Sequence, residues 1–426
     1  MKNEITAYYS DLPEDIKMFF DHQYYDAYAL IDAVRNPHTG LYSDAYMTLA
    51  DKLDRRCSIA ATGVGLIALC IADIEGWDDE AVDKAMLTLH TVTGRTAECQ
   101  PERDKQTGFF YHFIDAITGI NLHSEVSTID TALLVIGALF TAKHFRERVP
   151  ELVDLALELL KSIDWRVVVA DKEKGAINMV IDKGKGEKPI LPYSEYVLVA
   201  YLARLAQPND NDIKYLWEHA FAKEKIECLP RNDFHGFAVL KNALHNKGEF
   251  LSSFVHQFPF YLVYDYSTSE VYRHFYKNAC LVDRLSWEMI NYVPSYVWGY
   301  GAGSNDGLFE GYHADAINDN PKNIASAYIV AGFLPVYPAG IYDLYALYCL
   351  HIPYNDYKNI SDKKEQCEFR AAYRYGLHRY SWQYLNLPHR WYPQKVTVID
   401  WSSMLYGLCA LKRGMAFFTE RNDGRL

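Results

Sequence analysis

The segment LPYSEYVLVAYLARLA, residues 191–206, places one acid at the entrance of an apolar helix. Ser194 can cap a helix that starts at Glu195, and the helix dipole alone would favour an acid there. The helix is apolar on nearly every face, however, so it must be internal. An acid at the mouth of an internal helix, flanked by Tyr193 and Tyr196, is better placed for proton transfer than a surface acid. Glu195 is therefore the first candidate for a catalytic group, and Tyr193 is a candidate for substrate binding.

A second apolar run, HSEVSTIDTALLVIGALF at residues 123–140, also begins beside acids. Ser127 and Asp130 have the spacing of a capping box, so helix capping alone can explain Asp130. Glu125 stands just before the helix, where its carboxylate can face a cavity or remain a solvated loop acid. Glu125 is kept as a catalytic candidate and Asp130 as a substrate-binding candidate.

The segment GFFYHFIDAITG, residues 108–119, carries four aromatic residues and a histidine ahead of an aspartate. Such a loop can pack at a helix end. It can also line a sugar site, because tyrosine offers a flat apolar face and a hydroxyl on one ring. Tyr111 and His112 are candidate substrate-binding residues, and Asp115 is a candidate catalytic acid.

Two further runs are rich in aromatic residues. VWGYGAGSNDGLFEGYHAD, residues 297–315, contains glycines that let the backbone approach a ligand closely. HQFPFYLVYDY, residues 256–266, has a similar but weaker character. The candidates from these runs are Asp306 for catalysis and Trp298, Tyr300, His256 and Gln257 for substrate binding.

The C-terminal segment VTVIDWSSMLYGLCALKRG, residues 396–414, places Asp400 and Trp401 at the start of another internal helix. Asp400 is a catalytic candidate and Trp401 a substrate-binding candidate. Acids and aromatic residues at several helix entrances match the needs of glycoside hydrolysis. In that reaction one carboxylic acid protonates the leaving oxygen, and a second carboxylate activates water or attacks the sugar.

Other catalytic signatures do not occur in the sequence. The histidines show no HExxH spacing, and no Gly-rich phosphate loop or GxSxG elbow is present. The eight cysteines include no CxxC pair, so no zinc or redox motif is indicated. The sequence therefore predicts no metal and no other cofactor.

Helical periodicity extends through almost the whole chain. The expected helices are 14–34, 57–75, 79–95, 128–147, 150–162, 194–206, 212–223, 269–290, 322–332, 339–350, 364–377 and 399–417. Strand-like alternation is scarce, and residues 165–181 form the best hairpin candidate, with a turn near Lys174 and Gly175. The charged run at 183–189 reads as a solvated loop.

The expected helices are of two kinds. Five of them, 57–72, 128–142, 194–206, 322–332 and 400–412, are apolar or small nearly all round, whereas 79–95, 150–162 and 212–223 have charged faces. All-round apolar helices are buried, and amphipathic helices cover them. The alternation predicts an all-α fold, a single (α/α)6 barrel over residues 1–426 with about six inner and six outer helices and small loop or hairpin excursions.

Composition narrows the class of partner. The formal net charge is −12, which argues against nucleic acid as a partner because phosphate binding needs a basic face. The stretches 57–72 and 323–342 favour buried helices over membrane spans, since the first is short and the second contains two prolines. Aromatic residues make up 15% of the chain, which suits a neutral sugar ligand. The N-terminus lacks a signal-peptide core, so we expect a cytoplasmic protein or, alternatively, a periplasmic one whose signal has been removed.

Together these motifs resemble the bacterial glucoamylase-like family that includes the endo-β-1,2-glucanases. The similar runs, in the family's order, are NPHTGLYSD (36–44), CSIAATGVGLIALCIADIEGW (57–77), GFFYHFIDAITG, SEVSTIDTALL, PYSEYVLVAYLA, FVHQFPFYLVYD, WGYGAGSNDG and the late VID helix. The resemblance covers nearly the whole chain. The chain departs from the family pattern at Asn305, at residues 257–260 and at residues 399–403.

The resemblance implies an (α/α)6 barrel that hydrolyses β-1,2-glucan to sophoro-oligosaccharides with inversion. It matches Glu195 to the general acid. The base is open among Asp400, Asp306, Asp115 and Glu125, because in related enzymes a substrate hydroxyl can relay the proton. The rival functions are a transglycosylase, a hydrolase for another glucan linkage, a non-catalytic oligosaccharide-binding barrel, and a sugar epimerase or isomerase that uses His112 or His256 as its base.

Overall fold

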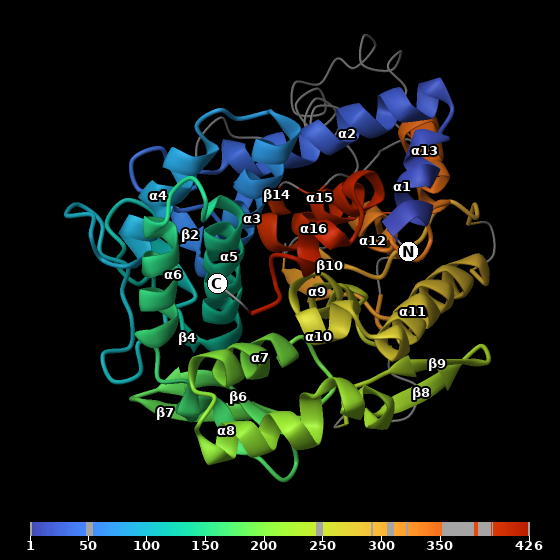
Figure 1. The fold of residues 1–426 in the computed structure, drawn as a ribbon. Coiled ribbons are helices and arrows are strands. Elements are labelled where there is room, and N and C mark those ends of the chain that lie inside the picture. Colours follow the sequence, from blue (N-terminus) through green and yellow to red (C-terminus); the bar gives the residue numbers. More distant parts are fainter. Residues whose placement is uncertain are drawn as a thin grey trace.

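The computed structural model describes residues 2–47, 54–243, 250–290, 293–304, 311–320, 323–351, 379–381, 393 and 395–424. Within these residues the longer helices form two concentric layers, as Figure 1 shows. The inner helices are α3 (Ile59–Glu75), α5 (Thr128–Phe145), α7 (Val197–Ala206), α9 (Phe254–Leu262), α12 (Ala327–Gly332) and α15 (Val398–Arg413). Each packs against the next in chain order, and α15 packs against α3, which closes the ring.

The outer helices cover this ring in the same order. They are α2 (Glu14–Ala33), α4 (Ala81–Val92), α6 (Glu151–Lys161), α8 (Asn211–Leu216), α11 (Glu270–Glu288) and α13 (Gly340–His351). Helix α2 covers α15 and α3, and each later outer helix contacts the inner helix that precedes or follows it in the chain. The observed alternation of inner and outer helices confirms the expected (α/α)6 barrel. Three further short α-helices are α1 (Lys2–Ser10), α10 (Tyr264–Ser267) and α16 (Ala416–Thr419).

Small residues bring the inner helices close together. A Cβ atom on Gly63 of α3 would lie 2.2 Å from the carbonyl oxygen of Leu133 in α5, and a Cβ on Gly137 would lie 2.2 Å from the carbonyl oxygen of Gly63. On the other side of the ring, a Cβ on Gly407 of α15 would lie 1.8 Å from the carbonyl oxygen of Ala331 in α12. The ring therefore depends on backbone approaches that only glycine permits.

One helix among the described residues, Thr128–Phe145, is long and apolar enough to cross a membrane by length and composition. However, 78% of its apolar window is buried inside the barrel. An inner helix must be apolar on all faces because other helices surround it.

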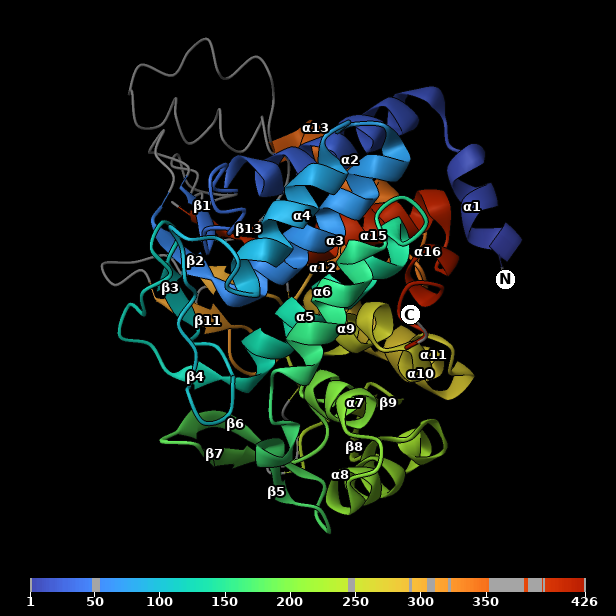
Figure 2. The ribbon, with the colours of Figure 1, turned by 60° about the vertical axis from the view of Figure 1, so that its left-hand side comes forward.

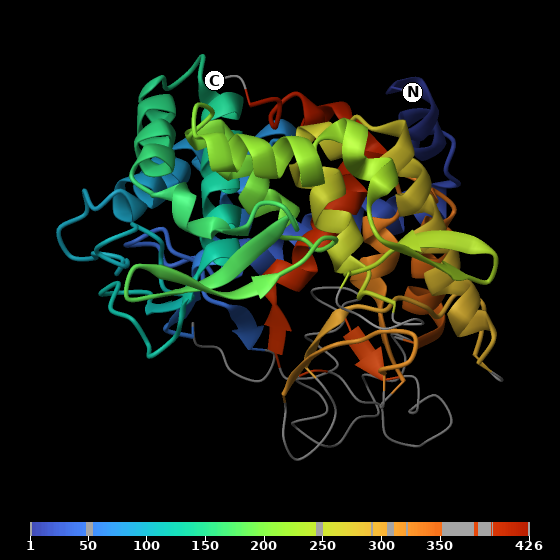
Figure 3. The same ribbon diagram turned by 90° about the horizontal axis from the view of Figure 1, so that it is seen from below.

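Short strands gather at one end of the barrel, the end at which the inner helices begin (Figure 2). They are β1 (Ala45–Met47), β2 (Arg56–Ser58), β3 (Phe113–Asp115), β4 (Val126–Ser127), β10 (Ala302–Ser304), β11 (Tyr312–Ala314), β12 (Ile324–Ser326), β13 (Arg379–Ser381) and β14 (Lys395–Thr397). All their pairings are antiparallel: β1 with β14, β2 with β3, β10 with β11, and β12 with β13, while β4 joins β6. Figure 3 shows the described N- and C-terminal segments at the opposite end.

A serine or threonine precedes every inner helix by one to three residues. These residues are Ser58, Ser127, Ser194, Ser253, Ser326 and Thr397. The Ser58 hydroxyl accepts the amide hydrogen of Ala61, and the Ser127 hydroxyl accepts that of Asp130. Such caps satisfy amides that have no partner within the helix. Six helix N-termini, with their partial positive charge, therefore point toward one end of the barrel.

The hairpin expected at 165–181 is present as β5 (Val169–Asp171) and β6 (Ala176–Asp182), with its turn at the predicted place. The run 183–189, expected to be a solvated loop, is instead mostly β7 (Lys185–Ile190), which pairs with β6. Backbone pairing orders this charged run although its side chains remain partly or fully exposed. A separate hairpin joins β8 (Arg231–Phe234) to β9 (Phe237–Leu240). The expected helix at 364–377 lies outside the described residues.

The inner helix α9 was read from the sequence as a ligand loop, and that reading is wrong. Pro259 lies inside it and has no amide hydrogen to donate to the carbonyl of Val255. The Tyr193 hydroxyl donates to that carbonyl instead, at 2.9 Å. The contact that keeps this helix intact thus comes from a residue far away in the sequence.

Candidate active site

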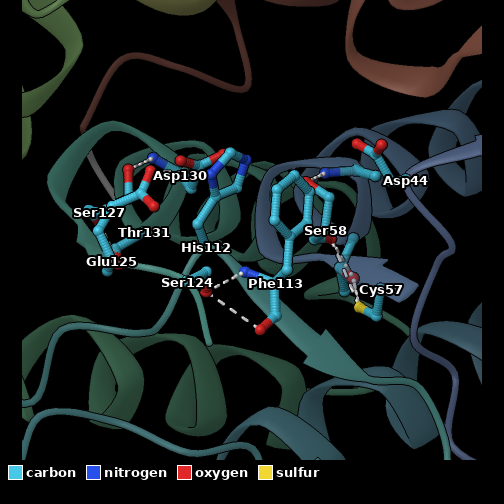
Figure 4. A network of polar contacts seen from close by, with 12 residues as sticks. Asp44, Cys57, Ser58, His112, Phe113, Ser124, Glu125, Ser127, Asp130 and Thr131 are labelled. Atoms are coloured by element: carbon cyan, nitrogen blue, oxygen red, sulfur yellow. Dashed lines mark hydrogen bonds and ion pairs between the residues drawn. The ribbon is translucent and has the colours of Figure 1, made fainter. Parts of the chain in front are cut away.

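His112 joins two carboxylates at the mouth of the barrel (Figure 4). Its Nδ1 atom lies 3.1 Å from Oε1 of Glu125, and its Nε2 atom lies 3.5 Å from Oδ1 of Asp130. The imidazole stacks on Phe113 with ring centroids 3.7 Å apart. Three residues from two candidate segments of the sequence therefore form one cluster. In it, the two ring nitrogens of His112 face one acid each.

Asp130 is more than a capping residue. Its amide donates to the Ser127 hydroxyl, which is one half of the expected capping box. The other half is absent, because the Ser127 amide donates to the carbonyl of Phe110 and not to the Asp130 carboxylate. That carboxylate is 9% exposed, and burial raises its pKa although His112 and the Ser127 hydroxyl lower it.

Glu125 lies closer to solvent. Its side chain is 51% exposed. Burial raises its pKa, but hydrogen bonds from its own amide and from His112, together with the charges of His112 and Lys188, outweigh burial and lower the pKa overall. Glu125 is therefore ionised at neutral pH and sits on the rim of the mouth.

Glu195 lies in the turn before α7, which begins at Val197, two residues later than expected. The Ser194 hydroxyl accepts the amide of Tyr196. Burial raises the pKa of the partly exposed Glu195 carboxyl, and only its own amide opposes this shift. Among the described residues, no cation pairs with Glu195. A carboxyl in such surroundings keeps its proton to higher pH than a solvated one, as a general acid must.

Tyr196 connects these acids. Its phenol is 5% exposed, and its pKa is raised by burial and by the negative charges of Glu195, Asp130 and Glu125, in that order. All three carboxylates therefore lie within electrostatic range of one hydroxyl group. Two sequence segments that were considered separately, 123–140 and 191–206, thus contribute to one site.

Asp44 belongs to the same cluster and was missed by the sequence reasoning. It is 7% exposed, and burial raises its pKa, while Arg56, His112 and Lys395 lower it. Arg56 Nη2 lies 3.0 Å from Asp44 Oδ2. The backbone of Asp44 joins the starts of two inner helices. Its amide donates to the Arg56 carbonyl just before α3, and its carbonyl accepts the Val398 amide at the start of α15. The only sequence signal was its place at the end of the NPHTGLYSD run.

Asp400 is buried at the start of α15, as expected. Its Oδ2 accepts the Thr397 hydroxyl at 2.5 Å, and its Oδ1 accepts the Tyr312 hydroxyl at 3.0 Å. Asp400 lines a small cavity together with Thr397 and with Ala302, Gly303 and Ser304 of β10. The acid thus faces the loop region between α11 and α12.

Asp115 is a structural residue, contrary to expectation. Its Oδ1 accepts the amides of Ile117 and Thr118 and the Thr118 hydroxyl, and its Oδ2 lies 2.7 Å from Arg55 Nη2. Burial raises its pKa, but these partners outweigh that effect and lower the pKa to about 2. A carboxylate with this many fixed partners holds its turn together and has little capacity left for proton transfer.

Replacing Asp115 by Ala should therefore destabilise the fold without slowing turnover. We expect a loss of about 1–3 kcal/mol in the free energy of unfolding, because the turn amides lose a charged acceptor. Urea unfolding measures the loss, and kcat/KM on β-1,2-glucan, the substrate that the family resemblance implies, measures the turnover. A tenfold or greater fall in kcat/KM at full folding would return Asp115 to the catalytic group.

Most aromatic candidates for substrate binding are core residues, which corrects the sequence reading. Trp298 and Trp401 are 0% exposed, and their indole N–H groups donate to Asp343 and to the carbonyl of Ala27 in α2. Tyr300 is 2% exposed and packs against Trp287. Tyr193 is 0% exposed and supports α9. Their rings fill the space between the helix layers and the loops at the mouth, so no ring face is left for a sugar.

The remaining candidates fall into three groups. His256 and Gln257 are buried in α9; burial lowers the pKa of His256 to about 3, and the Gln257 amide donates to the carbonyl of Ile329. Tyr111 is partly exposed next to His112 and stays a candidate contact. Asp306 lies outside the described residues.

No protein-family model matches the chain, and no curated protein matches it. Solved structures do share its fold. An endo-β-1,2-glucanase from Chitinophaga pinensis in complex with sophorotriose and glucose superposes with a TM-score of 0.73 at 15% identity over 96% of this chain and 97% of that one. An endo-β-1,2-glucanase from Talaromyces funiculosus in complex with sophorose gives 0.60 at 14% identity over 95% and 86%. A D-mannose isomerase gives 0.51 at 12% identity over 94% and 99%.

Proposed function

We propose that the chain is a glycoside hydrolase that cleaves β-1,2-glucan to sophoro-oligosaccharides, with Glu195 as general acid. The observation that carries the proposal is the cluster of acids at the mouth of the barrel: His112 lies 3.1 Å from Glu125 and 3.5 Å from Asp130, and Glu195 joins them through the raised pKa of Tyr196, to which burial and the charges of all three acids contribute. The substrate class is supported by the shared fold with glucanases that were crystallised with sophorotriose or sophorose.

In this proposal Glu195 donates its proton to the glycosidic oxygen as the bond to the leaving sugar breaks. Burial raises the pKa of Glu195, which keeps that proton available. A carboxylate on the opposite side of the sugar ring takes a proton from water, either directly or through a substrate hydroxyl, and the anomeric configuration inverts. Among the described acids, Asp130 and Asp400 are the buried candidates at the mouth for this base, while Glu125 lies on the rim.

The test is to incubate the protein with linear β-1,2-glucan and with a panel of other glucans, and to read product length, linkage and anomer by chromatography and NMR. Short β-1,2-linked products that appear as the α-anomer support the proposal. Longer products indicate a transglycosylase, and products from another glucan indicate a different linkage. Binding without turnover indicates a non-catalytic barrel, and a sugar of unchanged length indicates an isomerase or epimerase.

The two base candidates can be separated by chemical rescue. Asp130→Asn and Asp400→Asn should each be assayed with and without azide. Azide needs no general base, so it restores glycosyl transfer only in the variant that has lost the base. Rescue of neither variant would leave the rim acid Glu125 and Asp306 as the remaining candidates for the base.

Replacing His112 by Ala should lower kcat/KM by about tenfold. His112 lowers the pKa of both Asp130 and Glu125, so its loss raises both values and should move the acidic limb of the pH–rate profile to higher pH. His22→Ala is the matched control, because His22 also lies beside an aspartate, Asp26, but on the outer helix α2. An unchanged pH profile in His112→Ala would show that the imidazole only packs on Phe113.

A further inference from the structure

Asp283 of the outer helix α11 is a buried carboxylate that none of the steps above uses. Its side chain is 0% exposed, and no ion pair forms on it within the described part of the chain. Its Oδ2 accepts the Ser253 hydroxyl at 2.6 Å and the Tyr300 amide at 2.9 Å, and its Oδ1 accepts the Gly299 amide at 3.1 Å. A buried carboxylate is costly to keep unless its hydrogen bonds have a structural or functional use.

The partners of Asp283 lie at the mouth of the barrel. Ser253 immediately precedes the inner helix α9, and its amide donates to the Tyr300 carbonyl. Gly299 and Tyr300 begin a segment, residues 299–304, that ends in β10. The carboxylate of an outer helix therefore fixes two mouth elements to each other.

The segment 299–304 is held equally closely on its other side. The Ser326 amide, at the start of α12, donates to the Gly299 carbonyl, and a Cβ on Gly299 would lie 2.4 Å from the Ser326 carbonyl oxygen. The Tyr328 hydroxyl donates to the Ala302 carbonyl. The segment is therefore held between Asp283 on one side and the start of α12 on the other.

The far end of this segment reaches the candidate site. Ala302, Gly303 and Ser304 line the small cavity at Asp400, one of the acids proposed above as a base. We propose that Asp283 is a positioning residue, which holds residues 299–304 between the N-termini of α9 and α12 and so sets the wall of the cavity at Asp400. The proposal depends on the proposed function only for its kinetic test.

Hydrogen exchange tests the anchoring without a substrate. Asp283→Ala, and the isosteric Asp283→Asn in case the first variant fails to fold, should speed amide exchange in peptides covering residues 299–304 by about tenfold or more. Glu288→Gln is the matched control, because Glu288 is an acid of the same helix whose ion pair, within the described residues, is with Arg284. Unchanged exchange in a folded Asp283 variant would overturn the proposal, whether or not the protein hydrolyses glucan.

Kinetics then separate positioning from simple support of the fold. A shifted cavity wall should lower kcat/KM on β-1,2-glucan by about 10- to 100-fold. We expect this in Asp283→Asn at temperatures where it is fully folded, and not in Glu288→Gln. Faster exchange with unchanged kcat and KM would reduce Asp283 to a structural residue and overturn the positioning role. A wild-type protein that cleaves no glucan would contradict the proposed function, and the exchange result would still decide on the anchor.

The pH dependence of stability gives an independent readout. Burial raises the pKa of Asp283 to about 7, although its three hydrogen bonds lower it. Two ionisable groups interact electrostatically with Asp283: Cys280 on the same helix and Tyr300 on the segment, and Asp315 after β11 interacts with Tyr300. Arg284 of the same helix pairs with Glu288 instead. The contact from α9 comes from the uncharged Ser253. Because the pKa of Asp283 is higher in the folded than in the unfolded state, Asp283 adds to the free energy of unfolding at low pH. This contribution is complete below about pH 4 and is lost as pH rises toward 7.

Asp283→Asn should remove this contribution. Between about pH 4 and pH 8, the melting temperature of the variant should fall furthest below wild type near pH 4 and approach it near pH 8, whereas Glu288→Gln should follow wild type throughout. A constant difference in melting temperature between Asp283→Asn and wild type across this range would show that Asp283 does not titrate there. It would remove this support for a buried anchor.

Discussion

Replacing Glu195 by Gln is expected to lower kcat on β-1,2-glucan by about 10²–10⁴-fold, the usual contribution of a general acid. The amide keeps the shape of the side chain and its turn before α7, but it has no proton to give to the leaving oxygen. Oligosaccharide binding should persist, because within the described part of the chain no hydrogen bond depends on the acid form of this side chain. Calorimetry with a β-1,2-linked oligosaccharide measures the binding, and product chromatography measures the turnover.

The pH profile and the leaving group make this test specific. Since burial raises the pKa of Glu195, wild-type activity should fall on the alkaline side as the acid ionises, and Glu195→Gln should lack that limb. A substrate with a good leaving group, such as a glycosyl fluoride, needs little protonation, so the variant should cleave it nearly as fast as wild type does.

The matched control is Glu218→Gln. Glu218 is an exposed acid that pairs only loosely with Lys214, at 4.0 Å, so its neutralisation should leave turnover unchanged. Retention of more than a tenth of wild-type activity on glucan by Glu195→Gln would assign the acid to another residue.

Replacing Gly407 by Ala is expected to cost about 3 kcal/mol of stability, at the upper end for overpacking. The added methyl would lie 1.8 Å from the Ala331 carbonyl oxygen and 2.4 Å from its carbon, so α15 and α12 would have to move apart. The backbone cannot rotate out of the way as a flexible side chain could. Urea unfolding at neutral pH measures the loss.

Gly236→Ala is the control for this effect. It adds the same methyl group in the hairpin turn between β8 and β9, where no atom lies within 4 Å of the new Cβ. Its φ of +82° makes alanine strained there, which should cost about 1 kcal/mol. Equal losses in the two variants would show that the α12–α15 contact does not limit stability. Because α15 also carries Asp400, a surviving Gly407→Ala protein should bind substrate more weakly as well.

The architecture was predictable from the sequence because it depends on local pattern. Helices such as 57–75 and 128–147 are apolar on every face, which identifies them as internal without knowledge of their neighbours. The same reasoning failed for α9. Its proline argues against a helix by any local rule, and the helix persists because Tyr193, more than sixty residues earlier, satisfies the freed carbonyl of Val255.

The acids of the candidate site were recognised for a related reason. An acid at the entrance of an apolar helix, as at Glu195 just before α7 and at Asp130 and Asp400 in the first turns of α5 and α15, is visible as a break in the pattern. Which of these acids share a site was not visible, and neither was the role of Asp115, whose partner Arg55 lies far away in the sequence, just before β2. Aromatic residues were the least predictable, since Trp298 and Trp401 look alike whether they face a ligand or fill the core.

The sequence by itself therefore determined most of the helices, the inner or outer place of those with a clear apolar or charged pattern, and the acids at helix entrances, because helical period and capping act over a few residues. Only the tertiary structure decided that Asp44, His112, Asp130 and Glu195 face one mouth, that Asp115 is occupied by its own turn, and that Asp283 reaches the mouth from the outer layer. Closing a ring of helices brings distant residues together, and the pKa of each acid then depends on burial and on neighbours that no local pattern reveals.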